Sequence, residues 1–219
     1  MAGQCEIVYS LTVNPPKSKR RLPDIPHLVG LIDWKLPTLR RTKRKIDAAI
    51  TIHDLQKIAK RRVPRATYDY VEGGALQEIS YARSISSFKN LEFNVRVLRD
   101  VSKIDTSTEI FGKKVELPII FAPTGYTRFM YHVGEPAVAA VAQKNNMIYC
   151  LSTMGTTAPD ELAEAVPNVR RWFQLYMMQN REQSLSMINN AKNNGFETLL
   201  ITVDTPVSGH RLNLYGMAN

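Results

Sequence analysis

Two short apolar runs in the last quarter of the chain end in polar side chains that could bind a small ligand. Gln174 and Tyr176 stand at the end of one run, and Thr202 and Asp204 stand at the end of the next. A carboxamide both donates and accepts hydrogen bonds, a phenol donates one while neutral at pH 7, and a carboxylate accepts them. Such groups at matching places indicate a polar site where the two runs end.

The runs themselves are apolar on both faces, which is typical of buried strands in a parallel sheet. Two earlier runs end in the same way, so strands are expected at 118–122, 147–151, 171–175 and 199–203. Helical patterns at 134–145, 159–165 and 181–194 follow the first three. The alternation predicts βα units, and in a (β/α)8 barrel the carboxyl ends of the strands carry the active site.

Three shorter helices are expected upstream, at 51–62, 66–72 and 77–88. Thr51 is a candidate N-cap for the first of them, with Asp54 three positions on, although a full capping box would carry Glu or Gln there. Residues 93–117 show no sustained periodicity and are expected to form irregular strands and loops.

Composition and length limit the class of protein. The chain has 219 residues, 44% hydrophobic and 22% charged, which is ordinary for a globular domain. Its apolar runs are far shorter than the roughly 20 residues that span a bilayer, and no secretory leader is evident. Cys5 and Cys150 are too few for a disulfide framework or a zinc site, and no metal site is expected. A reducing, cytoplasmic location is therefore predicted.

The positive charge is concentrated at the N-terminus. Residues 1–65 hold 15 of the 29 Lys and Arg residues but only 5 of the 20 Asp and Glu residues. With the prolines at 15, 16, 23, 26 and 37, this predicts a basic, extended arm over 1–45. We favour a solvated extension over attachment to the inner, anionic face of a membrane. Nucleic-acid binding is not expected, because no aromatic residues alternate with the basic ones.

Six motifs in order resemble the FMN-dependent L-2-hydroxy acid dehydrogenase/oxidase family, which includes glycolate oxidase, lactate dehydrogenase of the flavocytochrome type and mandelate dehydrogenase. They lie at 68–75, 100–108, 122–125, 151–153, 172–176 and 200–206, and the resemblance covers about 46–211. It implies a (β/α)8 TIM barrel with FMN as cofactor, of which this chain carries about the first four βα units and an N-terminal helical extension. Residues 46–219 would form that domain.

The resemblance assigns roles to particular residues. Those implied to contact FMN are Pro123, Thr124, Gly125, Ser152, Gln174 and Thr202. Those implied to orient the substrate are Tyr70, Tyr176 and Arg211, and a guanidinium suits a carboxylate as a two-pronged donor. Tyr176 and Asp204 are the implied catalytic residues, Asp204 by orienting a histidine. Gly125, where many oxidases of the family carry Ala, favours a dehydrogenase.

The chain also departs from the family, because four βα units make about half a barrel. The Lys after the fifth strand, the His-Gly-Gly-Arg site and the phosphate loops are not found in it. We therefore expect a domain truncated on its C-terminal side, inactive alone. The alternative is a non-enzymatic remnant, or a half-barrel interaction module.

The expected partners follow from the same resemblance. The substrate would be a small L-2-hydroxy acid, with L-lactate favoured. The electron acceptor stays open among a quinone, a cytochrome and oxygen, and the assembly is either a homo-oligomer or a pair with a complementing half barrel.

Overall fold

The computed structural model describes residues 41–205, 207 and 209–212. The chain divides into two compact units, Met1–Ile50 and Thr51–Asn219. In the first, helix α2 covers Arg41–Asp47, so the boundary predicted between 45 and 46 falls within a helix. Most of the predicted arm lies outside the described residues, and the division at 45 stays a prediction.

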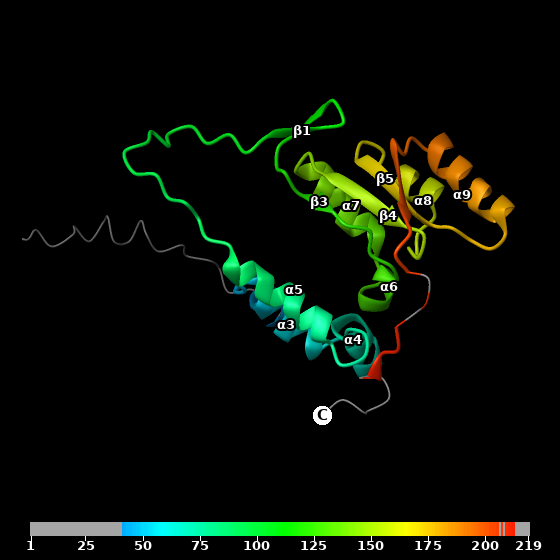
Figure 1. Ribbon diagram of the computed structural model, residues 1–219, viewed down its shortest axis with the longest axis horizontal. Coiled ribbons are helices and arrows are strands. Elements are labelled where there is room, and N and C mark those ends of the chain that lie inside the picture. The colour runs from blue at the N-terminus through cyan, green and yellow to red at the C-terminus, as the bar shows by residue number, and fades with distance from the viewer. Residues whose placement is uncertain (1–40, 206, 208, 213–219) are drawn as a thin grey trace, which may run out of the picture. The chain divides into compact units, whose positions relative to one another are not determined.

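The centre of the second unit is a parallel sheet of four strands in sequential order, with a helix after each of the first three (Figure 1). The strands are β3 Ile120–Phe121, β4 Ile148–Ser152, β5 Arg170–Tyr176 and β6 Thr198–Thr202. The helices are α7 Glu135–Lys144, α8 Pro159–Ala165 and α9 Arg181–Asn193. The βα order confirms the predicted partial barrel. The sheet is not closed, because β3 and β6 are its edges.

Strand residues alternate between two faces, and each face has its own core. On the helix side, Tyr149, Leu151, Phe173 and Leu175 pack with side chains from α7, α8 and α9, such as Leu162. This cluster is the main core of the unit.

The opposite face of the sheet carries a smaller cluster toward the amino ends of the strands. It is formed by Ile148, Cys150 and Trp172 with Val115. Ser152 continues the alternation of Ile148 and Cys150, and Gln174 continues that of Trp172. The register pairs Ser152 with Gln174. Both polar side chains are thereby placed on the face away from the helices, at the carboxyl ends of their strands.

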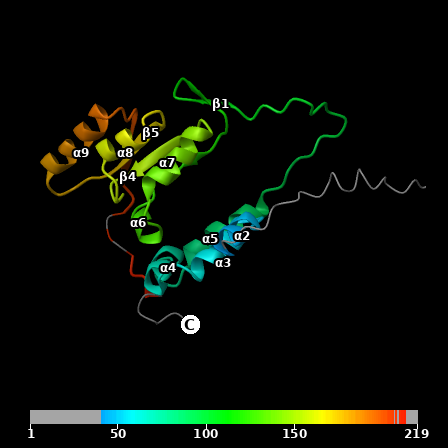
Figure 2. The same cartoon turned by 180° about the vertical axis from the view of Figure 1, so that it is seen from behind.

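An antiparallel hairpin, β1 Thr108–Ile110 and β2 Lys113–Val115, meets the amino end of β5. Arg170 donates a 2.8 Å hydrogen bond to the Ile110 carbonyl and forms an ion pair with Glu197, which also pairs with Lys113. The expectation of irregular strands and loops here is confirmed. From 91 to 107 the chain has neither helix nor strand, as both views show (Figures 1 and 2).

The three upstream helices form as predicted, as α3 Ile52–Lys60, α4 Arg65–Glu72 and α5 Ile79–Ser87, followed by the 3-10 turn η1 Phe88–Asn90. One local expectation was wrong: Asp54 completes the capping box of α3 without Glu or Gln. Its main-chain N–H donates to the Thr51 hydroxyl (3.2 Å), and its carboxylate accepts from the Thr51 N–H (3.1 Å). A short helix that was not expected, α6 Thr127–Met130, follows β3.

Candidate functional site

A cavity of about 390 Å³ lies where the strands of the sheet end. Nine of the ten residues predicted for the site line it, and the tenth, Asp204, does not. The lining is Tyr70, Val71, Pro123, Thr124, Gly125, Tyr126, Ser152, Met154, Gln174, Tyr176, Thr202 and Arg211. Residues from α4, from the strands β4, β5 and β6 and from the segments after β3, β4 and β6 therefore converge on one hollow.

A row of hydrogen bonds crosses the floor of the cavity from β4 to β6. The Ser152 hydroxyl donates to Oε1 of Gln174 at 3.0 Å, and Nε2 of Gln174 donates to the Thr202 hydroxyl at 2.8 Å. Ser152 and Gln174 are both buried. Three neighbouring strands thus share one polar line, whose members hold each other in fixed orientations.

The orientation of the Gln174 carboxamide follows from its neighbours. The Thr153 main-chain N–H lies 3.2 Å from Oε1 and can only donate, so this atom must be the acceptor. Oε1 already accepts two hydrogen bonds, whereas Nε2 has a second N–H beyond the one given to Thr202. The second N–H of Nε2 is therefore the donor that the carboxamide can offer a ligand.

Gly125 is tightly enclosed by the loop after β4. A Cβ at this position would lie 2.9 Å from the Cβ of Met154 and 3.3 Å from its carbonyl oxygen. That carbonyl accepts a 2.9 Å hydrogen bond from the N–H of Tyr126. A methyl group at position 125 would therefore clash with the loop after β4. The contact between these two loops of the protein requires glycine here.

Tyr70 and Arg211 meet at the wall of the cavity. The Arg211 guanidinium lies 4.5 Å from the centre of the Tyr70 ring and donates to the main-chain oxygens of Tyr70 and Gly73. The neighbouring His210 accepts a 2.8 Å hydrogen bond from the Leu76 N–H through its carbonyl. Arg211 therefore covers the C-terminal turn of α4 in addition to facing the cavity.

The two predicted catalytic residues differ in position. Tyr176 lines the cavity, and its main-chain N–H donates to the Thr153 hydroxyl at 3.0 Å. Asp204 is exposed, and its described partner is the hydroxyl of Thr205 at 3.3 Å. Asp204 does not line the cavity because the strand β6 ends at Thr202, before it, and its predicted role of orienting a histidine stays a prediction.

Sequence reasoning missed three lining residues, Val71, Tyr126 and Met154. Tyr126 forms an edge-to-face contact with Tyr70 (6.1 Å between ring centres) and stacks on Phe129 (5.1 Å). Its φ of 55° is left-handed, which is unusual for a bulky residue. The signal that was available is adjacency: each of the three directly follows, or lies within two residues of, a predicted site residue.

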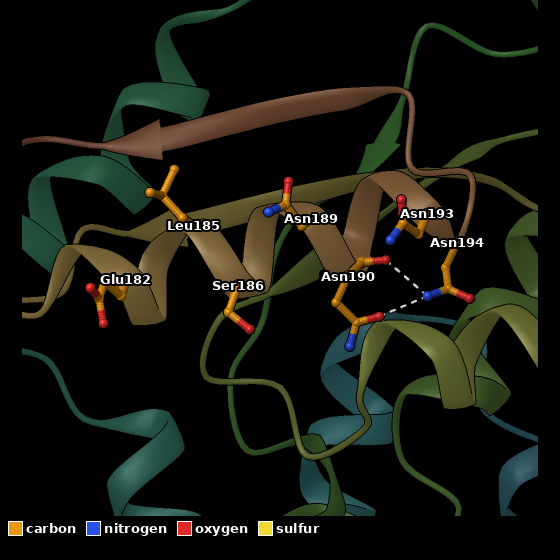
Figure 3. A pocket seen from close by; sticks show the side chains of 7 residues that line it. All are labelled: Glu182, Leu185, Ser186, Asn189, Asn190, Asn193 and Asn194. Atoms are coloured by element: carbon orange, nitrogen blue, oxygen red, sulfur yellow. Dashed lines mark hydrogen bonds between the residues drawn. The ribbon is translucent and has the colours of Figure 1, made fainter.

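A larger hollow of about 580 Å³ lies over the outer face of α9, where amide side chains gather (Figure 3). It is lined by Glu182, Leu185, Ser186, Asn189, Asn190, Asn193 and Asn194. Asn194 Nδ2 donates to the main-chain and side-chain oxygens of Asn190 at 2.8 and 2.7 Å. The described residues that line it all come from one helix and its end, so the smaller cavity, where several elements converge, is the better candidate site.

Within the described part of the chain, no three His, Cys, Asp or Glu side chains are grouped closely enough to bind a metal ion. The helices of that part are all too short or too polar to cross a membrane.

The family model of FMN-dependent dehydrogenases matches residues 59–215. A Mycobacterium tuberculosis protein, provisionally named an L-lactate dehydrogenase, is 43% identical over 193 residues, covering 88% of this chain and 47% of that protein. The L-lactate oxidase of Lysinibacillus sphaericus is 38% identical over 162 residues, covering 74% of this chain and 42% of its own length.

Solved structures agree with these matches. The monotopic membrane protein (S)-mandelate dehydrogenase superposes with a TM-score of 0.73 at 31% identity, over 77% of this chain and 45% of its own. A mandelate oxidase superposes with a TM-score of 0.71 at 31% identity, over 75% and 49%. This chain spans about half the length of the relatives that it matches.

Proposed function

Because this chain belongs to the FMN-dependent dehydrogenase family, we propose that it provides the flavin-facing part of an enzyme that oxidises a small L-2-hydroxy acid to the 2-oxo acid. The observation that carries this proposal is the cavity, since nine residues chosen from motifs far apart in the sequence line one hollow. L-lactate is the favoured substrate, supported by two relatives named for lactate.

The residues at the floor of the cavity fit the ring system of FMN, the cofactor of the family. A flavin pyrimidine presents carbonyl oxygens, and the second N–H of the Gln174 side chain and the hydroxyl of Thr202 are donors suited to them. Main chain at 123–125 would border the ring. When bound, FMN supplies the two-electron acceptor that no amino-acid side chain provides.

The substrate would lie beside Tyr70, Tyr176 and Arg211. A neutral phenol donates a hydrogen bond to a carboxylate without adding charge, and a guanidinium binds it as a fork. Arg211 would exchange part of its contact with the main-chain oxygens of α4 for the substrate carboxylate. Tyr176 would orient the hydroxyl group and stabilise negative charge that develops on its oxygen.

Loss of a proton from the hydroxyl group or from the α-carbon requires a base, and none of the described residues that line the cavity is a histidine or a carboxylate. We propose that a histidine from the other part of the barrel serves as base and that Asp204 orients it. The exposed position of Asp204 supports this role only if that other part covers it. By this account the chain alone does not turn over substrate.

We propose that the enzyme is a dehydrogenase rather than an oxidase. The support that Gly125 gives to this choice is weakened by its close contact with Met154. The electron acceptor remains one of a quinone, a cytochrome and oxygen. A cytoplasmic location stays a prediction. Attachment to the inner face of a membrane is the alternative, supported by the basic residues at 1–65 and by the monotopic relative.

Titration of FMN with the purified chain tests the flavin part of this proposal. Binding should quench flavin fluorescence with saturation, and Gln174→Leu should weaken the binding at least tenfold. Under anaerobic conditions, L-lactate should leave the absorbance of the bound flavin unchanged with the chain alone. Steady flavin bleaching by the chain alone would refute the proposed need for another part.

A second candidate function, a half-barrel interaction module, is supported by exposed apolar residues in a strand-like order. Leu91, Phe93, Val95 and Val97 alternate with polar residues, and their exposures are 72%, 98%, 78% and 79%. A separately expressed C-terminal half of the mycobacterial relative should bind this chain one to one, with or without FMN, if that function holds. A homo-oligomer would instead appear with this chain alone in analytical ultracentrifugation.

A further inference from the structure

Glu135, the first residue of α7, is a completely buried carboxylate outside the cavity. Its Oε1 accepts the Thr156 main-chain N–H at 2.6 Å, and its Oε2 accepts the hydroxyls of Thr156 and Thr157 at 2.6 and 2.8 Å. Among the described residues it has no ion pair. A buried charge is tolerated only when hydrogen bonds replace its lost water, and here one short turn supplies them.

Ionisable side chains of three elements interact with Glu135 or with its neighbours. Arg128 of α6 interacts electrostatically with Glu135, and it donates to the Thr156 carbonyl (3.1 Å) and to Glu161 of α8 (2.8 Å). Burial and, after it, the charge of Glu135 raise the pKa of Tyr149 of β4. Burial raises the pKa of Glu135, but the hydrogen bonds from Thr156 and Thr157 outweigh it and the net pKa is lowered. The side chain is therefore ionised at neutral pH.

The turn that Glu135 holds leads directly to the cavity. In it, the Met154 N–H donates to the Ser152 hydroxyl at 3.1 Å, and the Gly155 N–H donates to the Ser152 carbonyl at 2.9 Å. The Met154 carbonyl in turn accepts from Tyr126 at 2.9 Å. Thus the turn fixes the hydroxyl that orients Gln174, and it also fixes the loop after β3.

We propose that Glu135 is a positioning residue for the flavin-facing side of the cavity, acting through the 154–157 turn on Ser152 and on the loop at Tyr126. This inference depends on the proposed function only for the identity of the ligand, FMN. Its structural half, that one buried carboxylate orders two loops of the site, stands on the contacts above. Arg128 holds the same turn from outside, but its pair with Glu161 is exposed and contributes little.

The test uses the full chain with Glu135→Gln and, as control, Glu161→Gln, which removes a carboxylate near the same arginine. Amide hydrogen exchange without FMN is measured at Met154 and Tyr126 and compared with amides of β5. We expect exchange at Met154 and Tyr126 to rise at least tenfold in Glu135→Gln, with β5 unchanged and the control close to the wild type. FMN affinity should fall about tenfold in the same variant.

A second variant, Thr157→Val, removes one hydrogen bond to Glu135 and keeps the shape, in case Glu135→Gln does not fold. It should raise exchange at Met154 and Tyr126 several-fold. The proposal is overturned if exchange at these two amides stays within twofold of the wild type in the variants that fold. If the wild-type chain fails to quench FMN fluorescence, the proposed flavin binding is wrong, and the exchange data alone decide the role of Glu135.

Discussion

Nε2 of Gln174 donates a 2.8 Å hydrogen bond to the hydroxyl of Thr202, and this contact ties β5 to β6 at their carboxyl ends. With Ser152 on the other side, the carboxamide joins three strands. Residues that the sequence suggests as separate flavin contacts are thus one hydrogen-bonded unit, and a change in one member should affect the others.

Gln174→Leu should destabilise the chain more than Thr202→Val does. The first removes the side-chain partner of the buried Ser152 hydroxyl and of the half-buried Thr202 hydroxyl, and a buried polar group left unpaired costs about 1–3 kcal/mol. The second removes one hydrogen bond, worth about 0.5–1.5 kcal/mol. Urea unfolding measures both, with Asn189→Ala on the outer face of α9 as control. Equal effects of the two variants would show that the row does not act as a unit.

Gly125→Ala should destabilise the chain by about 1–3 kcal/mol, because the new methyl group would overlap the side chain of Met154. In the double variant Gly125→Ala, Met154→Gly, part of this loss should be recovered, since the Cβ of Met154 that the new methyl group would overlap is gone. A double-mutant cycle of unfolding free energies measures the coupling. If the two changes in unfolding free energy were strictly additive, the side chains at positions 125 and 154 would not interact.

Stability should fall as the pH drops below about 4.5, near the ordinary pKa of a glutamate. Hydrogen bonds lower the pKa values of Glu135 and Glu197 in the folded chain, against the effect of burial. A carboxyl whose folded pKa is depressed stabilises the fold above its unfolded pKa, and this contribution is lost as the pH falls through the folded value.

Urea midpoints between pH 7 and pH 3 measure this loss, and Glu135→Gln should show a shallower decline than the wild type. A wild-type midpoint that stays constant down to pH 3 would contradict the assigned hydrogen bonds.

The thiol of Cys150 should react only after unfolding. Burial in the sheet raises its pKa to about 12, so almost no thiolate exists at pH 8. A Cys5→Ser variant leaves Cys150 as the sole cysteine, and Ellman's reagent then reports on it alone. We expect no rapid reaction in buffer and one thiol per chain in urea. Rapid reaction in buffer would place Cys150 outside the core.

The sequence predicted the four strands and their order, because buried strands in parallel sheets carry a strong apolar signal. It also predicted nine lining residues through the family motifs. It missed Tyr126 because a left-handed φ in a tyrosine has no local signature. It did not reveal the contact of Arg211 with α4, because residues 141 positions apart meet only in the folded chain.

Asp204 is the one predicted site residue that does not line the cavity, because a motif fixes neighbours along the strand but not the course of the chain beyond it. Glu135 gave no functional signal either, since a glutamate in the first turn of a helix is ordinary. Its burial and its contacts with Thr156 and Thr157 emerge only from the packing of α7 against the turn after β4.

The most direct test of the central claim is a chimera in which residues 59–215 replace the matching part of the mycobacterial relative. The purified chimera is loaded with FMN and mixed anaerobically with L-lactate, glycolate or mandelate, and flavin absorbance is followed. We predict bleaching that is fastest with L-lactate and strongly slowed by Tyr176→Phe. A chimera that keeps FMN yet is not bleached by any 2-hydroxy acid would contradict the proposed function.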